Sequence, residues 1–191
     1  GSVAFVMDGP LAVFGPQAWL HAPFQALIYS LFERLATANL RPPIIVGLEK
    51  GGQFAEHAAA ISNKIERRTL MALPDSYIYG HVLASRPSAG SAFGRDTYYG
   101  QKFFYRTAQG QLLTLTTPLS PTAAADRHEP NRYPILPATI QLLDNIGTSL
   151  YADAVIPVAL AHSYASIPLK TGSRVLTLLS RQHLGSADQP Q

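Results

Sequence analysis

The most constraining feature of the sequence is an unbroken apolar run at residues 44–48, Ile-Ile-Val-Gly-Leu. A strand with one wet face alternates apolar and polar residues, whereas a strand covered on both faces is apolar throughout. The run lies between two segments with helical periodicity, residues 17–39 and a shorter one that begins after residue 52. A buried strand flanked by helices is typical of α/β domains. We therefore expect an α/β fold, a mixed sheet with helices packed on its faces.

Two β-hairpins are expected around this strand. The apolar runs at residues 3–7 and 11–14 are separated by a turn-forming Asp-Gly-Pro sequence, which predicts an N-terminal β-hairpin. Residues 101–107 and 111–117 alternate in polarity on both sides of a short turn that contains glycine, which predicts a second hairpin.

Periodicity predicts one long helix before the buried strand and several shorter helices after it. In residues 17–39 the apolar residues recur every three or four positions, and we expect this stripe to face the core. The stripe consists of Leu20, Phe24, Leu27, Ile28, Leu31 and Leu35. Later helices are expected at residues 76–84, 137–151, 156–167 and 173–184, with loops at 86–100 and 118–134.

Length and composition limit the classes to which the protein can belong. Its 191 residues suit one domain, expected at residues 1–184 and followed by a frayed tail at 185–191. The absence of cysteine excludes disulfides, thiolate metal sites and cysteine nucleophiles. A net charge of +3, with no run of Lys or Arg longer than two, permits nucleic-acid binding without arguing for it.

The sequence also constrains the surface of the protein and its location in the cell. Only 14% of the residues are charged, against about a quarter in ordinary domains, so we expect part of the surface to meet a partner. No apolar run approaches the roughly 20 residues that span a bilayer, and no signal peptide is visible, which predicts a cytoplasmic protein without a membrane partner. The opening Gly-Ser, followed at once by a strand, resembles a cloning remnant and predicts a fragment of a longer chain.

Two carboxylates stand where apolar strands are expected to end. Asp8 follows the run 3–7, and Glu49 follows the run 44–48. If the strands are neighbours, the two side chains meet at one edge of the sheet, where α/β proteins bind ligands. A divalent cation would offset their repulsion, and Asp75, placed like the N-cap of a short helix, could add a third oxygen ligand. Three carboxylates suit Mg²⁺ or Mn²⁺. The alternatives without a metal are a turn residue for Asp8, a solvated strand end for Glu49 and a simple helix cap for Asp75.

Other residues are weaker candidates. His162, in an apolar helix, is either a core histidine or a neighbour of a metal or phosphate. Lys50 and Lys102 flank strand ends and could hold phosphate, or could be ordinary exposed lysines. The strip from Tyr98 to Tyr105 combines aromatic and basic side chains, which can grip single-stranded nucleic acid by stacking and charge. Its alternative is a strand whose aromatic residues lie in the core.

Four segments resemble the NurA nuclease family. Residues 5–11, Phe-Val-Met-Asp-Gly-Pro-Leu, look like the opening strand of that family, although Pro10 stands where the family often has serine. Residues 45–52, Ile-Val-Gly-Leu-Glu-Lys-Gly-Gly, resemble a second strand with its lysine-bearing turn. Leu-Pro-Asp-Ser-Tyr-Ile at 73–78 resembles the acidic residue before a short helix, and the Ala-His segment at 157–167 resembles the closing motif.

The resemblance implies an RNase H-like fold and Mn²⁺- or Mg²⁺-dependent hydrolysis of DNA. It further implies end processing beside a HerA-type hexameric ATPase, in repair or in phage defence, and a homodimer. By position Asp8 is the first metal ligand, Asp75 a later one and His162 the C-terminal active-site histidine. Glu49 is the choice for the second acid, with Glu56 and Glu66 as competitors.

Two other functions remain open at this point. The domain could be a non-catalytic module that docks on a HerA-type ATPase ring and guides DNA, which the low charge would favour. A PIWI-like guide-binding domain is a third possibility, but no cluster of Lys and Arg is present to bind a 5′ phosphate. A nuclease needs at least three carboxylates that converge within a few ångströms, and a docking module does not.

Overall fold

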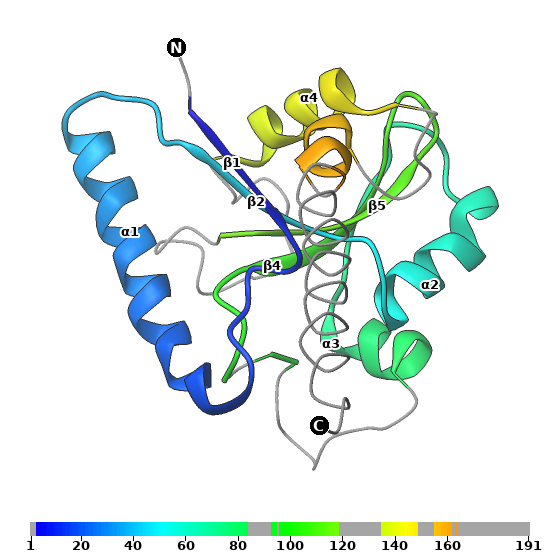
Figure 1. Ribbon diagram of the computed structural model, residues 1–191, viewed down its shortest axis with the longest axis horizontal. Coiled ribbons are helices and arrows are strands. Elements are labelled where there is room, and N and C mark those ends of the chain that lie inside the picture. Colours follow the sequence, from blue (N-terminus) through cyan, green and yellow to red (C-terminus); the bar gives the residue numbers. More distant parts are fainter. Residues whose placement is uncertain are drawn as a thin grey trace, which may run out of the picture.

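The computed structural model describes residues 3–83, 93–94, 96–118, 135–148, 155–161 and 163. These residues form a five-stranded sheet in the order β1-β2-β5-β4-β3 (Figure 1). β1 is parallel to β2, and all other neighbours are antiparallel. The strands are β1 (Ala4–Asp8), β2 (Ile44–Glu49), β3 (Leu70–Ala72), β4 (Gln101–Arg106) and β5 (Leu112–Thr117). The mixed α/β sheet expected from the sequence is confirmed.

Helices connect and cover these strands. The predicted long helix is α1 (His21–Thr37), and it follows a 3₁₀ segment, η1 (Gly15–Leu20). α2 (Gln53–Ile61) continues into η2 (Ser62–Lys64), and α3 (Asp75–Tyr77) continues as one π-helical turn, η3 (Ile78–Val82). α4 (Leu136–Ile146) ends before the predicted residue 151, and residues 156–161 are helical. The predicted helix at 173–184 and the predicted tail lie outside the described residues.

The N-terminal hairpin is the main error of the sequence-based fold. β1 pairs in parallel with β2, with Val6 opposite Val46, and residues 11–14 form no strand. After Gly9, which has a φ of 128°, the chain crosses over β2, and Leu11 becomes fully buried. A Cβ on Gly47 would lie 2.5 Å from the Gly9 carbonyl oxygen, so only glycine allows this crossing. The burial of Leu11 and the pairing of β1 with the apolar strand β2 together stabilise this arrangement more than a local hairpin would.

The second hairpin is confirmed. β4 and β5 pair in antiparallel register from Gln101 opposite Thr117 to Arg106 opposite Leu112. Alternation along β4 sends Phe103 and Tyr105 to one face, where they pack with α4 and with Val46 and Leu48. Phe104 points to the other face and packs with Phe54 and Ala58 of α2. The sheet is therefore covered by α4 on one face and by α2 on the other.

The apolar stripe predicted for α1 is only partly buried. Ile28 and Phe32 pack on Leu11 and the strand residue Ile45. Three members of the predicted stripe are instead exposed, with exposed fractions of 42% for Phe24, 65% for Leu27 and 39% for Leu31. α1 is apolar on more than one side, and the sequence pattern did not determine which side meets the sheet. In the part of the chain that the structure describes, no helix is long and apolar enough to cross a membrane.

Candidate functional site

The candidate site lies where the parallel strands β1 and β2 end side by side. Asp8 is the last residue of β1, and Lys50 directly follows β2. The Lys50 ammonium contacts Asp8 Oδ2 at 2.7 Å, with exposed fractions of 23% and 43% for the two side chains. A carboxylate and an ammonium group are thus held together at an accessible sheet edge, the place where ligands of α/β proteins bind.

Asp8 and Glu49 end neighbouring strands, as expected, but lie on opposite faces of the sheet. Asp8 is in register with Leu48, which packs in the core on the α4 face. Because side chains alternate along a strand, Glu49 points to the α2 face. Asp8 therefore lines one cavity and Glu49 another. The expected meeting of the two carboxylates is not found.

The cavity at Asp8 has a volume of about 440 Å³. Its walls come from β1, from Leu142 and Ile146 of α4, and from the segment 157–161. Ala161 is the last residue of that segment to line it. His162, which follows directly in the sequence, lies outside the described residues. The structure thus brings Asp8 beside the segment that precedes the predicted histidine, although the two are separated by most of the chain.

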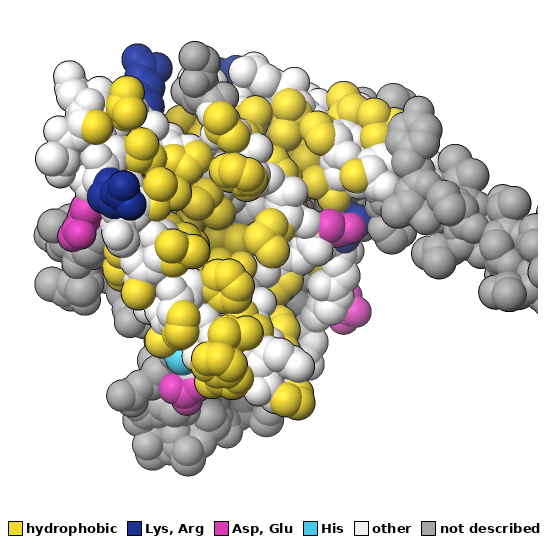
Figure 2. Space-filling view, turned by 60° about the vertical axis from the view of Figure 1, so that its left-hand side comes forward, with side chains coloured by type: hydrophobic (Ala, Val, Ile, Leu, Met, Phe, Trp, Pro, Cys, Tyr) yellow, Lys and Arg dark blue, Asp and Glu magenta, His cyan; other side chains and the backbone are white. Residues whose placement is uncertain are grey.

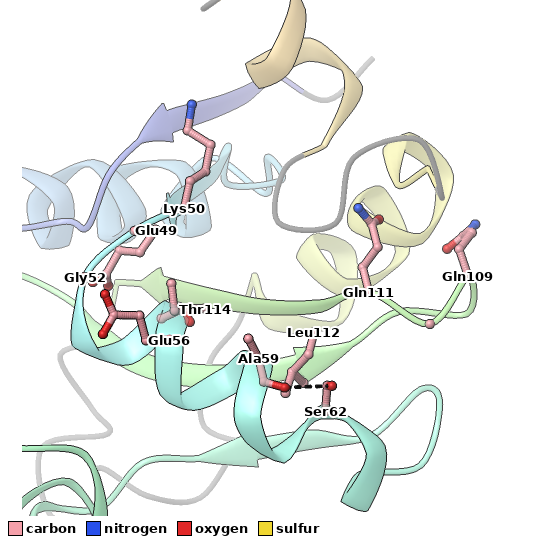
Figure 3. A pocket seen from close by; sticks show the side chains of 13 residues that line it. Glu49, Lys50, Gly52, Glu56, Ala59, Ser62, Gln109, Gln111, Leu112 and Thr114 are labelled. Atoms are coloured by element: carbon pink, nitrogen blue, oxygen red, sulfur yellow. Dashed lines mark hydrogen bonds between the residues drawn. The ribbon is translucent and has the colours of Figure 1, made fainter.

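The cavity on the α2 face is larger, about 660 Å³. Figure 3 shows Glu49 and Glu56 near Gly52 at one end of it, with Lys50 pointing away from them. Glu56 was a competitor for the second acidic position and lies in this cavity, whereas Glu66 does not line it. Thr114 also lines the cavity, and its buried hydroxyl has no hydrogen-bond partner. Of the two carboxylates that line the cavity, Glu56 is the exposed one, whereas Glu49 is 11% exposed.

Lys102 is a buried group and not the exposed phosphate-binding lysine expected from the sequence. Its side chain is 1% exposed, and its ammonium forms an ion pair with Glu49, whose side chain is 11% exposed. The ammonium also lies 4.2 Å from the ring centre of Phe54 and 4.8 Å from that of Tyr98. Burial lowers the pKa of Lys102 to about 7. Lys102 thus neutralises Glu49 inside the protein and is shielded from a nucleic-acid strand.

Asp75 stands at the other end of the sheet from Asp8. It follows β3, which is separated from β1 by four inter-strand spacings, or roughly 19 Å at the usual distance between strands. Asp75 is the first residue of α3, and Pro74 occupies the N-cap position predicted for Asp75. Burial, and to a smaller extent the negative charge of Asp75, raise the pKa of Tyr79. Asp75 and Asp8 are too far apart to bind one metal ion.

The three predicted carboxylate ligands therefore do not fit a single metal centre. In the residues that the structure describes, no three His, Asp or Glu side chains are grouped closely enough to hold an ion. Glu49 is already paired with Lys102, and Asp8 with Lys50.

The predicted aromatic strip is largely core. Tyr105 is 1% exposed and donates a hydrogen bond to Asp144 Oδ1 at 2.9 Å. Burial and this contact raise the pKa of Tyr105. Tyr98 packs edge-on against Phe14, and burial raises its pKa to about 12. The rings of Tyr98 and Tyr105 are therefore not open to stacking by nucleic-acid bases. They fit the alternative interpretation, in which the aromatic residues of the strip lie in the core.

Two polar residues, Thr114 and Asp144, were not predicted from the sequence to have a role. Thr114 belongs to the alternating Leu-Thr-Leu-Thr segment at 113–116, a signal that one face of β5 is polar. Asp144 accepts hydrogen bonds from the Tyr105 hydroxyl and from the Ala108 amide, and it ties α4 to the β4–β5 turn. No local pattern marks Asp144, because its partners lie more than 30 residues away in sequence.

Comparisons of the chain with protein-family models, with curated proteins and with solved structures found no match.

Proposed function

We propose that the chain is a DNA nuclease of the NurA type that hydrolyses phosphodiester bonds at the sheet edge beside Asp8. The observation that carries the proposal is the shared cavity of Asp8 and Ala161. These two residues belong to the first and last segments that resemble the NurA family. A carboxylate near the start of the chain and the segment before His162 therefore line the same cavity, as a common active site would require.

The Asp8–Lys50 pair supports a hydrolytic role. The Lys50 ammonium lies 2.7 Å from Asp8 Oδ2, so a cation and a carboxylate stand side by side at this site. An ionised carboxylate can orient a water molecule and accept its proton as the water attacks phosphorus. The ammonium can stabilise the negative charge of the phosphate oxygens. In this proposal His162 protonates the leaving oxygen, a role that rests on the resemblance alone.

The identity of the cofactor is a separate part of the proposal. The resemblance implies Mn²⁺ or Mg²⁺, which would supply charge stabilisation and an activated water. Asp8, Glu49 and Asp75 do not lie close enough together to hold one such ion. The roles of Asp8, Lys50 and His162 in this proposal are therefore those of protein side chains alone. The RNase H-like class of the sheet, the HerA-type ATPase partner, and a place in DNA repair or antiviral defence rest on the resemblance in the same way.

The proposal is tested by incubating the protein with linear single- and double-stranded DNA and Mn²⁺ or Mg²⁺, with and without EDTA. Release of short products that EDTA abolishes is the expected result. Cleavage that survives EDTA would keep the nuclease and remove the metal ion from the proposal. Intact DNA in all lanes, with a cooperative unfolding transition to prove that the protein is folded, would contradict hydrolysis by this chain alone.

A non-catalytic docking module is the second candidate. It is favoured by the absence of three converging carboxylates among the described residues and by exposed apolar side chains on β1 and α1. The two functions differ when a HerA-type ATPase is added to an inactive sample. Cleavage that appears only with the ATPase supports a nuclease that needs its partner. Stable complex formation without cleavage supports the docking module.

A further inference from the structure

Lys50 reaches Asp8 because of the course that the chain takes at the end of β2. Leu48 packs on the α4 face of the sheet, and Glu49 points to the α2 face. Because side chains alternate along an extended chain, Lys50 returns to the α4 face, where Asp8 is in register with Leu48. The contact of 2.7 Å between Lys50 and Asp8 therefore requires that the chain stay extended from residue 48 to residue 50.

Among the described strands, backbone pairing holds this stretch only as far as Glu49. The register of β1 with β2 ends at Asp8 and Leu48. The register of β2 with β5 ends at Glu49 and Thr114. Lys50 follows β2 outside the strand, and two glycines come next, the second with a φ of 81°. Because glycine restrains the backbone least and strand ends open easily, a further contact is needed to keep Lys50 on the α4 face.

The side chain of Glu49 supplies such a contact. Its carboxylate forms an ion pair with the ammonium of Lys102, which belongs to β4. The Lys102 side chain is 1% exposed and lies under the rings of Phe54 and Tyr98, so its place in the core is fixed. β5 lies between β2 and β4, and the ion pair thus ties the end of β2 to a strand that is not its neighbour.

The described surface beside Asp8 is mainly apolar. On the side of the molecule that carries α1, hydrophobic side chains gather in a broad field with few charges among them (Figure 2). On β1, Phe5 and Met7 are exposed by 56% and 42%, and Val6 lines the cavity at Asp8. Few charges are therefore present to draw Lys50 to this part of the sheet edge, and its place depends on the course of β2.

We propose that Glu49 and Lys102 are positioning residues, whose ion pair keeps Lys50 on the same side of the sheet as Asp8. Neither Glu49 nor Lys102 touches the substrate in this proposal. Their effect passes through the backbone at Glu49, which fixes the direction of the next side chain. Where the proposal concerns catalysis, it rests on the proposed function, in which Lys50 stabilises phosphate charge. The position of Lys50 itself does not depend on that function.

The test measures how fast Lys50 is acylated by an N-hydroxysuccinimide ester in the absence of DNA, with each lysine followed in its own peptide by mass spectrometry. The chain has four lysines, and the exposed Lys64 serves as the internal reference. The wild type gives the rate for Lys50 in contact with Asp8, where its side chain is 23% exposed. Asp8→Asn removes the partner carboxylate and gives the rate for the released side chain.

The decisive variant carries both Lys102→Met and Glu49→Gln, which removes the ion pair and leaves no buried charge. The rates are compared at pH 6, where Lys102 of the wild type is protonated. Lys50 of the double variant is expected to be acylated about fivefold faster, since losing one hydrogen-bonded contact shifts a local equilibrium by about that factor. The rate for Lys64 is expected to stay unchanged. Glu56→Gln is the matched control and is expected to keep the wild-type rate at Lys50, because Glu56 lines the same cavity as Glu49 but lies outside the ion pair.

A purely structural role of the ion pair predicts a different result. The double variant is expected to regain stability, so a structural role would return Lys50 to the wild-type rate together with the melting temperature. A folded double variant whose Lys50 is acylated at the wild-type rate overturns the proposal. Asp8→Asn with an unchanged rate at Lys50 overturns it as well, because the contact with Asp8 would then be absent in solution. If the double variant does not fold, Glu49→Gln alone is judged by the same two rates, since a buried lysine without a counter-ion can lose its proton.

Cleavage assays keep this proposal apart from the proposed function. If the chain cleaves DNA, kcat of the double variant should fall towards that of Lys50→Met. A double variant with a released Lys50 and the wild-type kcat would overturn the catalytic part of the proposal. A wild type that does not cleave DNA would contradict the proposed function, and the acylation rates would still decide whether the ion pair positions Lys50.

Discussion

Lys102 and Glu49 form an ion pair inside the protein, although 53 residues separate them in sequence. Lys102 comes from β4 and Glu49 from β2, and the pair spans β5, which lies between those strands. The rings of Phe54 and Tyr98 cover the ammonium. A buried pair of this kind need not stabilise the fold relative to apolar residues, but loss of one partner leaves an uncompensated charge.

Replacement of Lys102 alone is therefore expected to be costly. Lys102→Met leaves the Glu49 carboxylate buried without its counter-ion and should lower the free energy of unfolding by about 3 kcal/mol. The double variant Lys102→Met with Glu49→Gln should regain most of that loss, because no buried charge remains. Urea unfolding at pH 6, where Lys102 is protonated, measures both. Equal losses in the single and double variants would show that the charge of Glu49 is not the cause.

The buried lysine also predicts how stability depends on pH. The pKa of Lys102 is about 7 in the folded protein and 10.5 in the unfolded chain. Between those values the unfolded chain binds more protons, so the free energy of unfolding rises with pH, by at most about 1.4 kcal/mol per pH unit. Below pH 7 the folded and the unfolded states both hold this proton, so Lys102 no longer makes the free energy of unfolding depend on pH. Urea titrations between pH 7 and 10.5 should show this slope in the wild type and its loss in the variant carrying Lys102→Met and Glu49→Gln. Parallel curves for the two proteins would show that Lys102 is not the source of the slope.

Gly47 is expected to be intolerant of a side chain. A Cβ there would approach the backbone of the crossing segment to 2.5 Å at the Gly9 carbonyl oxygen and 2.8 Å at the Leu11 nitrogen. Gly47→Ala should cost about 2–3 kcal/mol of unfolding free energy, as overpacked cores do. Gly51→Ala is the control, because nothing lies within 4 Å of a Cβ at Gly51. Similar melting temperatures for the two variants would contradict the crossing of residues 9–11 over β2.

Local patterns in the sequence predicted the elements whose partners are close in the chain. The apolar run at 44–48 is β2, and the alternating segments around residues 108–110 form the β4–β5 hairpin. Both depend on properties that a short window contains, namely burial on two faces and a tight turn.

The elements that were missed depend on distant partners. β1 pairs with β2, about 40 residues away, in place of its sequence neighbour. In α1, Phe24, Leu27, Ile28, Leu31 and Phe32 are all apolar, so periodicity alone allowed more than one side to face the core. Lys102 has the sequence context of an exposed lysine, and only the placement of Glu49 and Phe54 buries it. Candidate site residues could thus be named from the sequence, but the sheet face of each could not.

In the proposed function, Asp8 belongs to a site that cleaves DNA. Its most direct test compares the cleavage rates of the wild type, Asp8→Asn and Asp96→Asn on linear DNA with Mn²⁺. Asp96 is an exposed aspartate that lines neither cavity described above. Because Asp8 and Lys50 form a partly exposed pair, which stabilises the fold by only about 0–1 kcal/mol, Asp8→Asn should fold normally.

Asp8→Asn is expected to cut at least about 100-fold more slowly, since it loses the only ionised group assigned to the attacking water, while DNA binding and unfolding stay unchanged. Asp96→Asn is expected to keep the wild-type rate. A folded Asp8→Asn protein that cleaves DNA as fast as the wild type would show that Asp8 is not part of the cleavage site.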